Sequence, residues 1–222
     1  IILVGMLHAA EITKQPLEIF ESGASAGLNL GFDEYAYSLG QGRRWGPTRA
    51  PLIIDTIWRG NMPPLYAPLQ VVGRHGCDLN PIDASSRQDR ERLLSYVWAD
   101  QVHRLARVEA ALGLAAAEHR QVEQADAAEW LPGMLAVPQP GGVTRVLIHT
   151  VVWQYIPADK RQAIETLIAR TGAAATRQRP FAHLAVEGDG QPEARVDLTV
   201  WPSGETVTLG RADFHGRWVD WA

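Results

Sequence analysis

The sequence predicts one α/β domain over residues 1–222, with a mostly parallel sheet, helices on both faces and an antiparallel hairpin near the C-terminal end. Short apolar runs of strand character alternate with stretches of helical periodicity up to residue 171. The last strand-like segments then follow one another without a helix between them. With 222 residues, of which 46% are hydrophobic and 21% charged, the chain can bury one sizeable core.

The first part of the chain is expected to contain two strands of this sheet and an insertion. A helix over residues 1–13 ends before Pro16, and a strand follows at 17–20. Residues 33–68 are interpreted as the insertion. Within them, apolar residues alternate ahead of a glycine turn, as in a strand and hairpin, and a loop rich in proline follows. The next strand is expected to cover 69–72.

The second part is expected to alternate helices with strands before it ends in consecutive strands. An apolar stripe predicts a long helix over 88–112, with Gly113 as its stop. Asp126 is a candidate cap for a short helix at 127–131, and a further helix is expected over 157–171. The expected strands are 119–122, 143–148, 182–187, 195–201 and 206–209.

The overall composition argues against several classes of partner and site. The net charge of −4 is unlike that of a nucleic-acid surface, which would be basic. Cys77 is the only cysteine, so an intrachain disulfide and a zinc site of several cysteines are excluded, and we expect no metal and a reducing cytoplasm. The apolar run at residues 1–7 is too short to span a membrane, so no membrane partner is expected. We interpret it as a buried segment whose natural N-terminal neighbours are missing.

A turn of small residues follows the first strand and is the most informative stretch of the chain. Glu21 closes the strand, and Gly23, Ser25 and Gly27 punctuate the turn before an apolar pattern resumes. A strand, a small-residue turn and a helix start can hold a nucleotide-like ligand on a parallel sheet. In dinucleotide sites the ribose-binding acid comes about 20 residues after the glycines, whereas here the acid precedes them. This order resembles motif I of class I S-adenosylmethionine-dependent methyltransferases; the alternative is an ordinary tight strand-to-helix turn.

A resemblance that covers nearly the whole chain rests on five stretches, residues 21–30, 76–83, 125–127, 153–155 and 211–218. In these stretches the sequence resembles an uncharacterised bacterial family, one of the domain-of-unknown-function families, whose core is similar to a class I methyltransferase. The resemblance implies a Rossmann-like sheet, S-adenosylmethionine as cofactor, and an N-terminal helical part that is absent here.

Two acids resemble cofactor-binding positions of the methyltransferase class. Asp78, after the second strand, resembles the acid that binds the ribose hydroxyls, because a carboxylate accepts both hydrogens of a diol. Asp126, with Ala127 beside it, resembles the acid that binds the adenine amino group. Each has an alternative: Asp78 as a loop acid that accepts from nearby main-chain N–H groups, and Asp126 as a helix N-cap only.

Catalytic candidates lie at the end of the fourth strand, where methyl acceptors usually bind in that class. His149 is a candidate general base for an O or N nucleophile. Tyr155, with Trp153, is a candidate aromatic wall for a sulfonium cation. The alternative is that His149 is a hydrogen-bonded strand-end residue and that the aromatic side chains belong to the core.

Two other functions stay open at this stage. The turn fits Gly-x-Ser-x-Gly, so Ser25 with His149 could form a hydrolase site. A non-catalytic binding module is the other alternative, because the Ser25 side chain could crowd the cofactor. The methyl acceptor, a small molecule or a protein, and the oligomeric state are not determined by the sequence.

Overall fold

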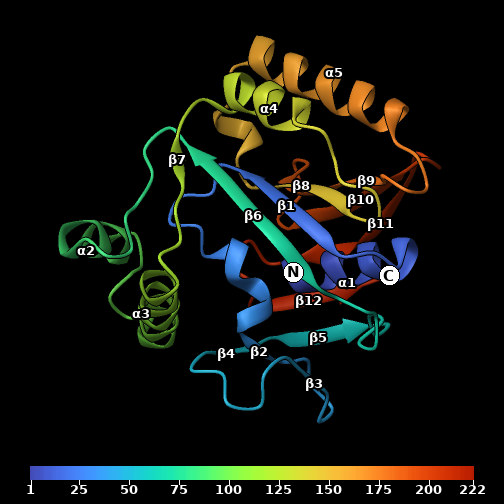
Figure 1. Ribbon diagram of the computed structural model, residues 1–222. Helices are drawn as coiled ribbons and strands as arrows, with labels where there is room; N and C mark the ends of the chain where they lie inside the picture. The colour runs from blue at the N-terminus through green and yellow to red at the C-terminus, as the bar shows by residue number, and fades with distance from the viewer.

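The computed structural model describes residues 1–222 as a nine-stranded sheet with helices on both faces and a small three-stranded sheet beside it (Figure 1). The order of the large sheet is β5-β12-β11-β10-β9-β8-β1-β6-β7, and that of the small sheet is β3-β2-β4. The strands of the large sheet are β1 (Leu17–Ser22), β5 (Ile57–Gly60), β6 (Val71–Asp78), β7 (Glu123–Gln124), β8 (Thr144–Thr150), β9 (Phe181–Gly188), β10 (Ala194–Trp201), β11 (Glu205–Ala212) and β12 (Trp218–Trp221).

The parallel part of the sheet comprises β7, β6, β1, β8 and β9. The chain moves outward from β1 to β6 and β7, and then returns to pair β8 with the other side of β1. The strand order therefore reverses at β1, and ligands of open α/β sheets bind at such a reversal, beyond the carboxyl ends of the strands. Here those ends bring Ser22 between Cys77 and His149.

Strands β9 to β12 form an antiparallel set at the C-terminal end, which confirms the expected α/β class with antiparallel strands late in the chain. The set is longer than expected. The tail adds β12, and β5 then pairs with β12 in parallel across the sheet edge. Strand β5 has no recognisable sequence pattern, because its residues are largely exposed and the strand exists only through its long-range partner.

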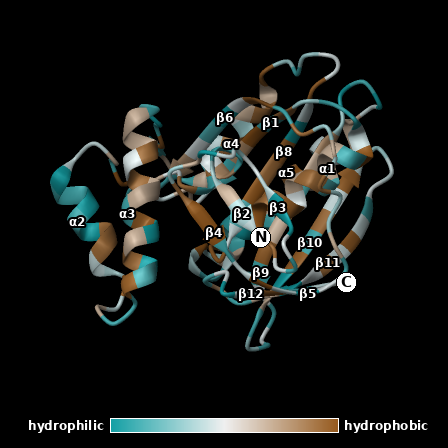
Figure 2. Ribbon diagram, turned by 90° about the horizontal axis from the view of Figure 1, so that it is seen from below, coloured by the Kyte–Doolittle hydropathy of each residue, from teal (hydrophilic) through white to brown (hydrophobic).

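Helices cover both faces, as Figure 1 shows. Helices α4 (Ala127–Ala136) and α5 (Ala158–Ala174) lie together on one face, and α1 (Ile2–Thr13) lies on the other. The first six residues of β8 are buried, which explains the apolar run Val146 to Ile148 at its centre. Coloured by hydropathy, the central strands are mostly brown, whereas α2 (Arg87–Ser95), which has no buried residue, is largely teal (Figure 2).

The expected helix over 88–112 is two helices, α2 and α3 (Val102–Ala117). The Ser95 hydroxyl donates to the Arg92 carbonyl, which competes with the helical main chain, and a turn with exposed aromatic residues follows. Gly113 does not end the helix as expected. It lies inside α3, which continues to Ala117, because an isolated glycine is tolerated within a helix.

Smaller differences occur at other elements. The turn after β1 leads into a short 3₁₀ helix, η1 (Asn29–Glu34), instead of an α-helix. The strand expected at 119–122 lies slightly later, as β7, and α4 continues past Pro132 to Ala136. Three strands within the segment interpreted as an insertion form the small sheet. The antiparallel pairing of β2 (Ala36–Ser38) with β3 (Arg44–Trp45) confirms the expected hairpin. Strand β4 (Ile53–Asp55) pairs with β2 in parallel.

Two helical glycines provide a matched test of the packing between α5 and the sheet. A side chain at Gly172 would overlap the Trp201 ring, whereas a side chain at Gly113 would meet nothing within 4 Å. Gly172→Ala should destabilise the protein by about 1–3 kcal/mol through overpacking. Gly113→Ala should stabilise it by about 0.5–1 kcal/mol, because alanine loses less backbone entropy in a helix. Urea unfolding of both variants measures the difference, and equal effects would contradict the close approach of α5 to β10.

Candidate functional site

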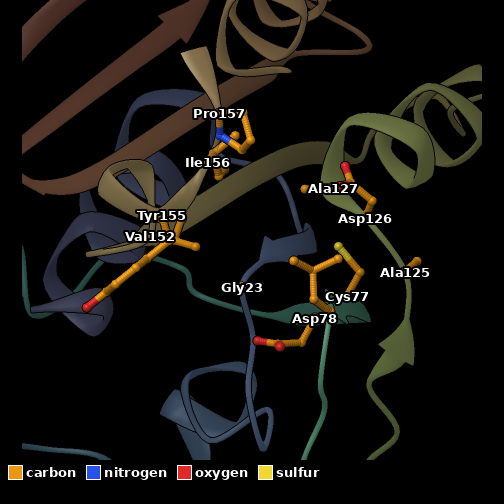
Figure 3. Close-up of a pocket in the computed structure, with 11 residues that line it drawn as sticks. Gly23, Cys77, Asp78, Ala125, Asp126, Ala127, Val152, Tyr155, Ile156 and Pro157 are labelled. Carbon is orange, nitrogen blue, oxygen red and sulfur yellow. The ribbon is translucent and has the colours of Figure 1, made fainter. Parts of the chain in front are cut away.

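A cavity of about 250 Å³ lies at the carboxyl ends of β1, β6, β7 and β8, where the strand order reverses (Figure 3). Five of the residues singled out from the sequence line it, whereas Glu21, Ser25, Gly27 and His149 do not. The sheet therefore brings together candidates that are more than 130 residues apart in sequence. The lining residues are Gly23, Cys77, Asp78, Leu79, Ala125, Asp126, Ala127, Val152, Tyr155, Ile156 and Pro157.

The turn after β1 requires unusual backbone conformations at three places. Gly23, Ser25 and Gly27 have φ of 72°, 52° and 65°, in the left-handed region that favours glycine. A side chain at Gly23 would lie only 2.5 Å from Val152 Cγ2, so glycine is also needed for close approach to the segment after β8.

Most main-chain donors of this turn are already used inside the protein. The N–H groups of Gly23 and Ala24 both donate to the Cys77 carbonyl at 2.9 Å, and that of Gly27 donates to the Ala24 carbonyl at 2.7 Å. A phosphate-binding loop needs such N–H groups to be free. The turn is therefore built to fix the backbone beside the cavity and is poorly suited to cradle a phosphate.

Asp78 ties the turn to the end of β6. Its Oδ2 accepts from the Ser25 N–H at 2.9 Å, and its Oδ1 accepts from the Asn80 N–H at 2.9 Å. The interpretation of Asp78 as a loop acid that accepts from main-chain N–H groups is confirmed. Each carboxylate oxygen accepts more than one hydrogen bond, so this role leaves acceptor capacity at a residue that also lines the cavity.

Asp126 is the N-cap of α4, as its position before the helix predicted. Its Oδ1 accepts from the Ala128 N–H at 2.8 Å, and its Oδ2 accepts from Lys160 Nζ at 2.7 Å. The hydrogen bond from Lys160 is the main cause that holds the pKa of Asp126 below its ordinary value. The carboxylate therefore stays ionised at the cavity rim, and Ala127, the first helical residue, has an N–H group without a partner in its own helix.

Glu21 is fully buried beside the cavity wall. Burial is the main cause that raises its pKa to about 8, and the charge of Asp78 raises it further. Asn29 Nδ2 donates to Oε1 at 2.8 Å and also lies 3.4 Å from Thr150 Oγ1, whereas Oε2 has no hydrogen-bond partner. At pH 7 this side chain is therefore a neutral carboxylic acid that joins β1, η1 and β8.

His149 does not line the cavity, so its interpretation as a general base gains no support from the site. Its ring is buried, with Nδ1 at 2.7 Å from Glu187 Oε1 and Nε2 at 2.8 Å from His183 Nε2. It also stacks on Trp153, with centroids 3.9 Å apart and planes 4° from parallel. Both nitrogens are engaged, so the arrangement matches the alternative of a hydrogen-bonded strand-end residue.

The hydrolase arrangement is likewise not formed. No hydrogen bond joins the Ser25 hydroxyl to His149, whose two nitrogens contact Glu187 and His183 instead. Tyr155 lines the edge of the cavity, where the residue is 76% exposed. Its hydroxyl end points away from Asp78 and Asp126 (Figure 3).

Glu187 is a structural residue of the site that the sequence did not reveal. Its Oε1 accepts from the N–H groups of Val152 and Trp153 at 3.0 and 3.3 Å, in addition to its contact with His149. Val151, which directly precedes Val152, has φ 53°, a strained conformation for a residue with a β-branched side chain. Glu187 therefore holds a strained segment that forms one wall of the cavity. Its position at the end of the expected strand 182–187 was the only available signal.

Two other titratable side chains near the site are neutral at pH 7. Burial raises the pKa of the Cys77 thiol to about 12, so it is no nucleophile at the cavity floor. Burial, and then the neighbouring His149, lower the pKa of His183 to about 3.

Residues 1–221 match the model of a protein family described as "Uncharacterized protein conserved in bacteria (DUF2332)". The chain belongs to this family. No curated protein and no solved structure matches the chain. Because the family description names no activity, the chemistry of the site itself carries any proposal about this DUF2332 chain.

Two further observations on the DUF2332 chain concern metal ions and membranes. No cluster of three or more His, Cys, Asp or Glu side chains has the geometry to hold a metal ion. None of its helices combines the length and the apolar character needed to cross a membrane.

The buried Glu21 predicts a pH dependence of stability. Between its ordinary pKa of 4.5 and its folded pKa of about 8, the folded state keeps a proton that the unfolded state has lost. The free energy of unfolding should therefore fall as the pH rises from about 5 to 8, by up to about 1.4 kcal/mol per pH unit.

Glu21→Gln removes the titration, so its unfolding free energy should depend less on pH. Urea unfolding of both proteins at pH 6, 7 and 8 measures the two slopes. The comparison uses slopes and not absolute stabilities, so a general loss of stability in the variant does not affect it. Identical slopes would show that Glu21 is ionised in the folded protein.

Proposed function

We propose that this chain is an S-adenosylmethionine-dependent methyltransferase whose cofactor binds in the cavity at the ends of β1, β6, β7 and β8. The observation that carries the proposal is the placement of Gly23, Asp78 and Asp126 around one cavity at the strand-order reversal. The order β7-β6-β1-β8-β9 is the 3-2-1-4-5 order of nucleotide-binding α/β sheets. The antiparallel set β10–β12 extends beyond the late antiparallel strand typical of class I methyltransferases.

The chemistry of the lining favours this cofactor over a phosphate-bearing nucleotide. Two carboxylates line the cavity, no arginine or lysine does, and seven of the eleven lining residues are hydrophobic. Together with the occupied N–H groups of the turn, this lining disfavours phosphates. S-adenosylmethionine suits it, since the molecule combines a flat base, a ribose diol and a sulfonium cation without a phosphate.

Individual residues fit parts of this molecule. The remaining acceptor capacity of Asp78 suits the ribose diol, and Gly23 allows close approach of the backbone. Asp126 and the N–H group of Ala127 suit the adenine edge, while Tyr155 offers an aromatic face at the rim. When bound, the cofactor supplies an electrophilic methyl group. At about 250 Å³ the cavity lies just below the roughly 300 Å³ at which small-molecule sites begin, so part of the ligand would extend beyond it.

The two other functions have less support. A hydrolase would need Ser25 beside a free imidazole nitrogen, and His149 has none. A non-catalytic relative would keep the fold without the cofactor. The Ser25 side chain, however, does not line the cavity, so the crowding that motivated this alternative is removed.

Calorimetric titration with S-adenosylmethionine and S-adenosylhomocysteine tests the proposal. We expect micromolar binding of both. Tyr155→Ala should weaken it by about tenfold, because stacking of a base on an aromatic side chain is worth about 1–3 kcal/mol. Tyr155 is largely exposed, so its truncation should leave the fold intact.

Tyr66→Ala is the matched control, since Tyr66 is fully exposed and lines no part of the cavity. This variant should bind both ligands as the native protein does. No heat with either ligand from a folded protein would refute the cofactor proposal and leave the binding module. Equal losses in the two variants would refute the assigned position of the cofactor.

A further inference from the structure

A second cleft, of about 340 Å³, lies on the other side of the segment that follows β8. Thr150 and Val151 line this second cleft, whereas Val152 lines the first cavity. Asn29 also lines the second cleft and connects it to the buried Glu21 through a hydrogen bond. The two sites are therefore separated by the strained segment around Val151, at the reversal of strand order.

Two arginines of α3 give the second cleft a positive charge. Arg104 and Arg107, about one helical turn apart, line it, and neither forms an ion pair. The only side-chain partner of Arg104 is Gln101 Oε1 at 3.1 Å, and Arg107 has none. Burial, and then Arg107, lower the pKa of Arg104. A guanidinium stays protonated in proteins, so both carry their charge.

The nearest acid, Asp213, raises the pKa of Arg104 but offsets the charge of the two arginines only in part. Asp213 is engaged by Arg217 Nη2 at 2.7 Å and by the N–H groups of His215 and Arg217 at 3.0 and 3.2 Å. No Asp or Glu lines the second cleft. Two cationic side chains there are left to attract an anion, and the planar guanidinium matches carboxylate and phosphate oxygens in pairs.

The rest of the second cleft is mostly apolar. Phe32, Tyr35 and Tyr37 are buried side chains that line it. The hydroxyls of both tyrosines donate to main-chain carbonyls, of Leu28 and Phe32, at 2.7 Å. Their polar groups are thereby satisfied, so the tyrosines offer mainly ring surface to a ligand.

We propose that the second cleft binds a small organic anion with an apolar body and one carboxylate or phosphate head held by Arg104 and Arg107. On the basis of the proposed function, we assign this anion as the methyl acceptor. The two sites would then hold the two reactants on opposite sides of the segment Thr150 to Val152.

Benzoate, phenyl phosphate and benzamide are suitable probes, because benzamide has nearly the shape of benzoate without its charge. Ligand-observed NMR titration should give at least tenfold tighter binding of one or both anions than of benzamide. A carboxylate site favours benzoate, and a phosphate site favours phenyl phosphate. No preference for either anion over benzamide would overturn the proposal.

Arginine variants locate the preference. In the double variant Arg104→Gln with Arg107→Gln, the ratio of anion affinity to benzamide affinity should fall to near one. The double variant Arg104→Lys with Arg107→Lys keeps the positive charge and should keep most of this ratio, which separates a loss of charge from a loss of folding. Arg43→Gln with Arg44→Gln removes the same charge from two exposed residues outside the second cleft and should change nothing. If the protein with glutamine at both 104 and 107 still prefers an anion over benzamide, the assignment of the anion site to Arg104 and Arg107 is overturned.

Calorimetry with S-adenosylhomocysteine distinguishes this inference from the cofactor proposal. Its affinity should be the same in native protein and in the glutamine pair at 104 and 107, and it should bind together with the preferred anion. Competition between the two would overturn the acceptor role. Anion binding without any S-adenosylhomocysteine binding would refute the methyltransferase and keep the second cleft as an anion site.

Discussion

The carboxylate of Asp78 fixes the feature on which the site depends, the turn between β1 and η1. Ser25 stands in a left-handed conformation that costs a residue other than glycine about 1–3 kcal/mol. Its N–H donates to the Asp78 carboxylate, and a hydrogen bond to a charged group contributes about 1.5–3 kcal/mol. The two terms are of similar size, so a serine is tolerated where a third glycine would be expected. The same bond holds Asp78 at the edge of the cavity.

The opposite wall depends on a second acid. Glu187 accepts hydrogen bonds from Val152, Trp153 and His149, and so holds Val151 in a strained conformation. Strain of this kind persists only where surrounding contacts determine it, and it is concentrated at functional sites. Asp78 and Glu187 thus hold the two segments that meet where Gly23 approaches Val152. Loss of Glu187 would change the cavity without any change in the residues that line it, whereas Asp78 is itself one of those residues.

Local patterns predicted the α/β class, the turn, and the N-cap at Asp126, because each depends on neighbouring residues. They could not predict β5, which forms only through its pairing with a strand about 160 residues later. The position of His149 at a strand end was correct, but its partners Glu187 and His183 come from β9, and nothing in the sequence placed their side chains around the ring. Strand ends therefore located the site, while side-chain pairing across strands decided the role of each residue.

The enclosure of His149 also bears on what the second cleft can bind. A neutral hydroxyl or amine acceptor would need a base to remove its proton, and His149 has no free nitrogen to serve as one. An acceptor whose anionic carboxylate or phosphate oxygen itself attacks the methyl group has no proton to lose and needs no such base. The unpaired Arg104 and Arg107 select for an anion on charge alone. The arginine pair, and not the enclosure of His149, therefore decides the class of acceptor, because the imidazole of His215 also lines the second cleft and its ring forms no hydrogen bond.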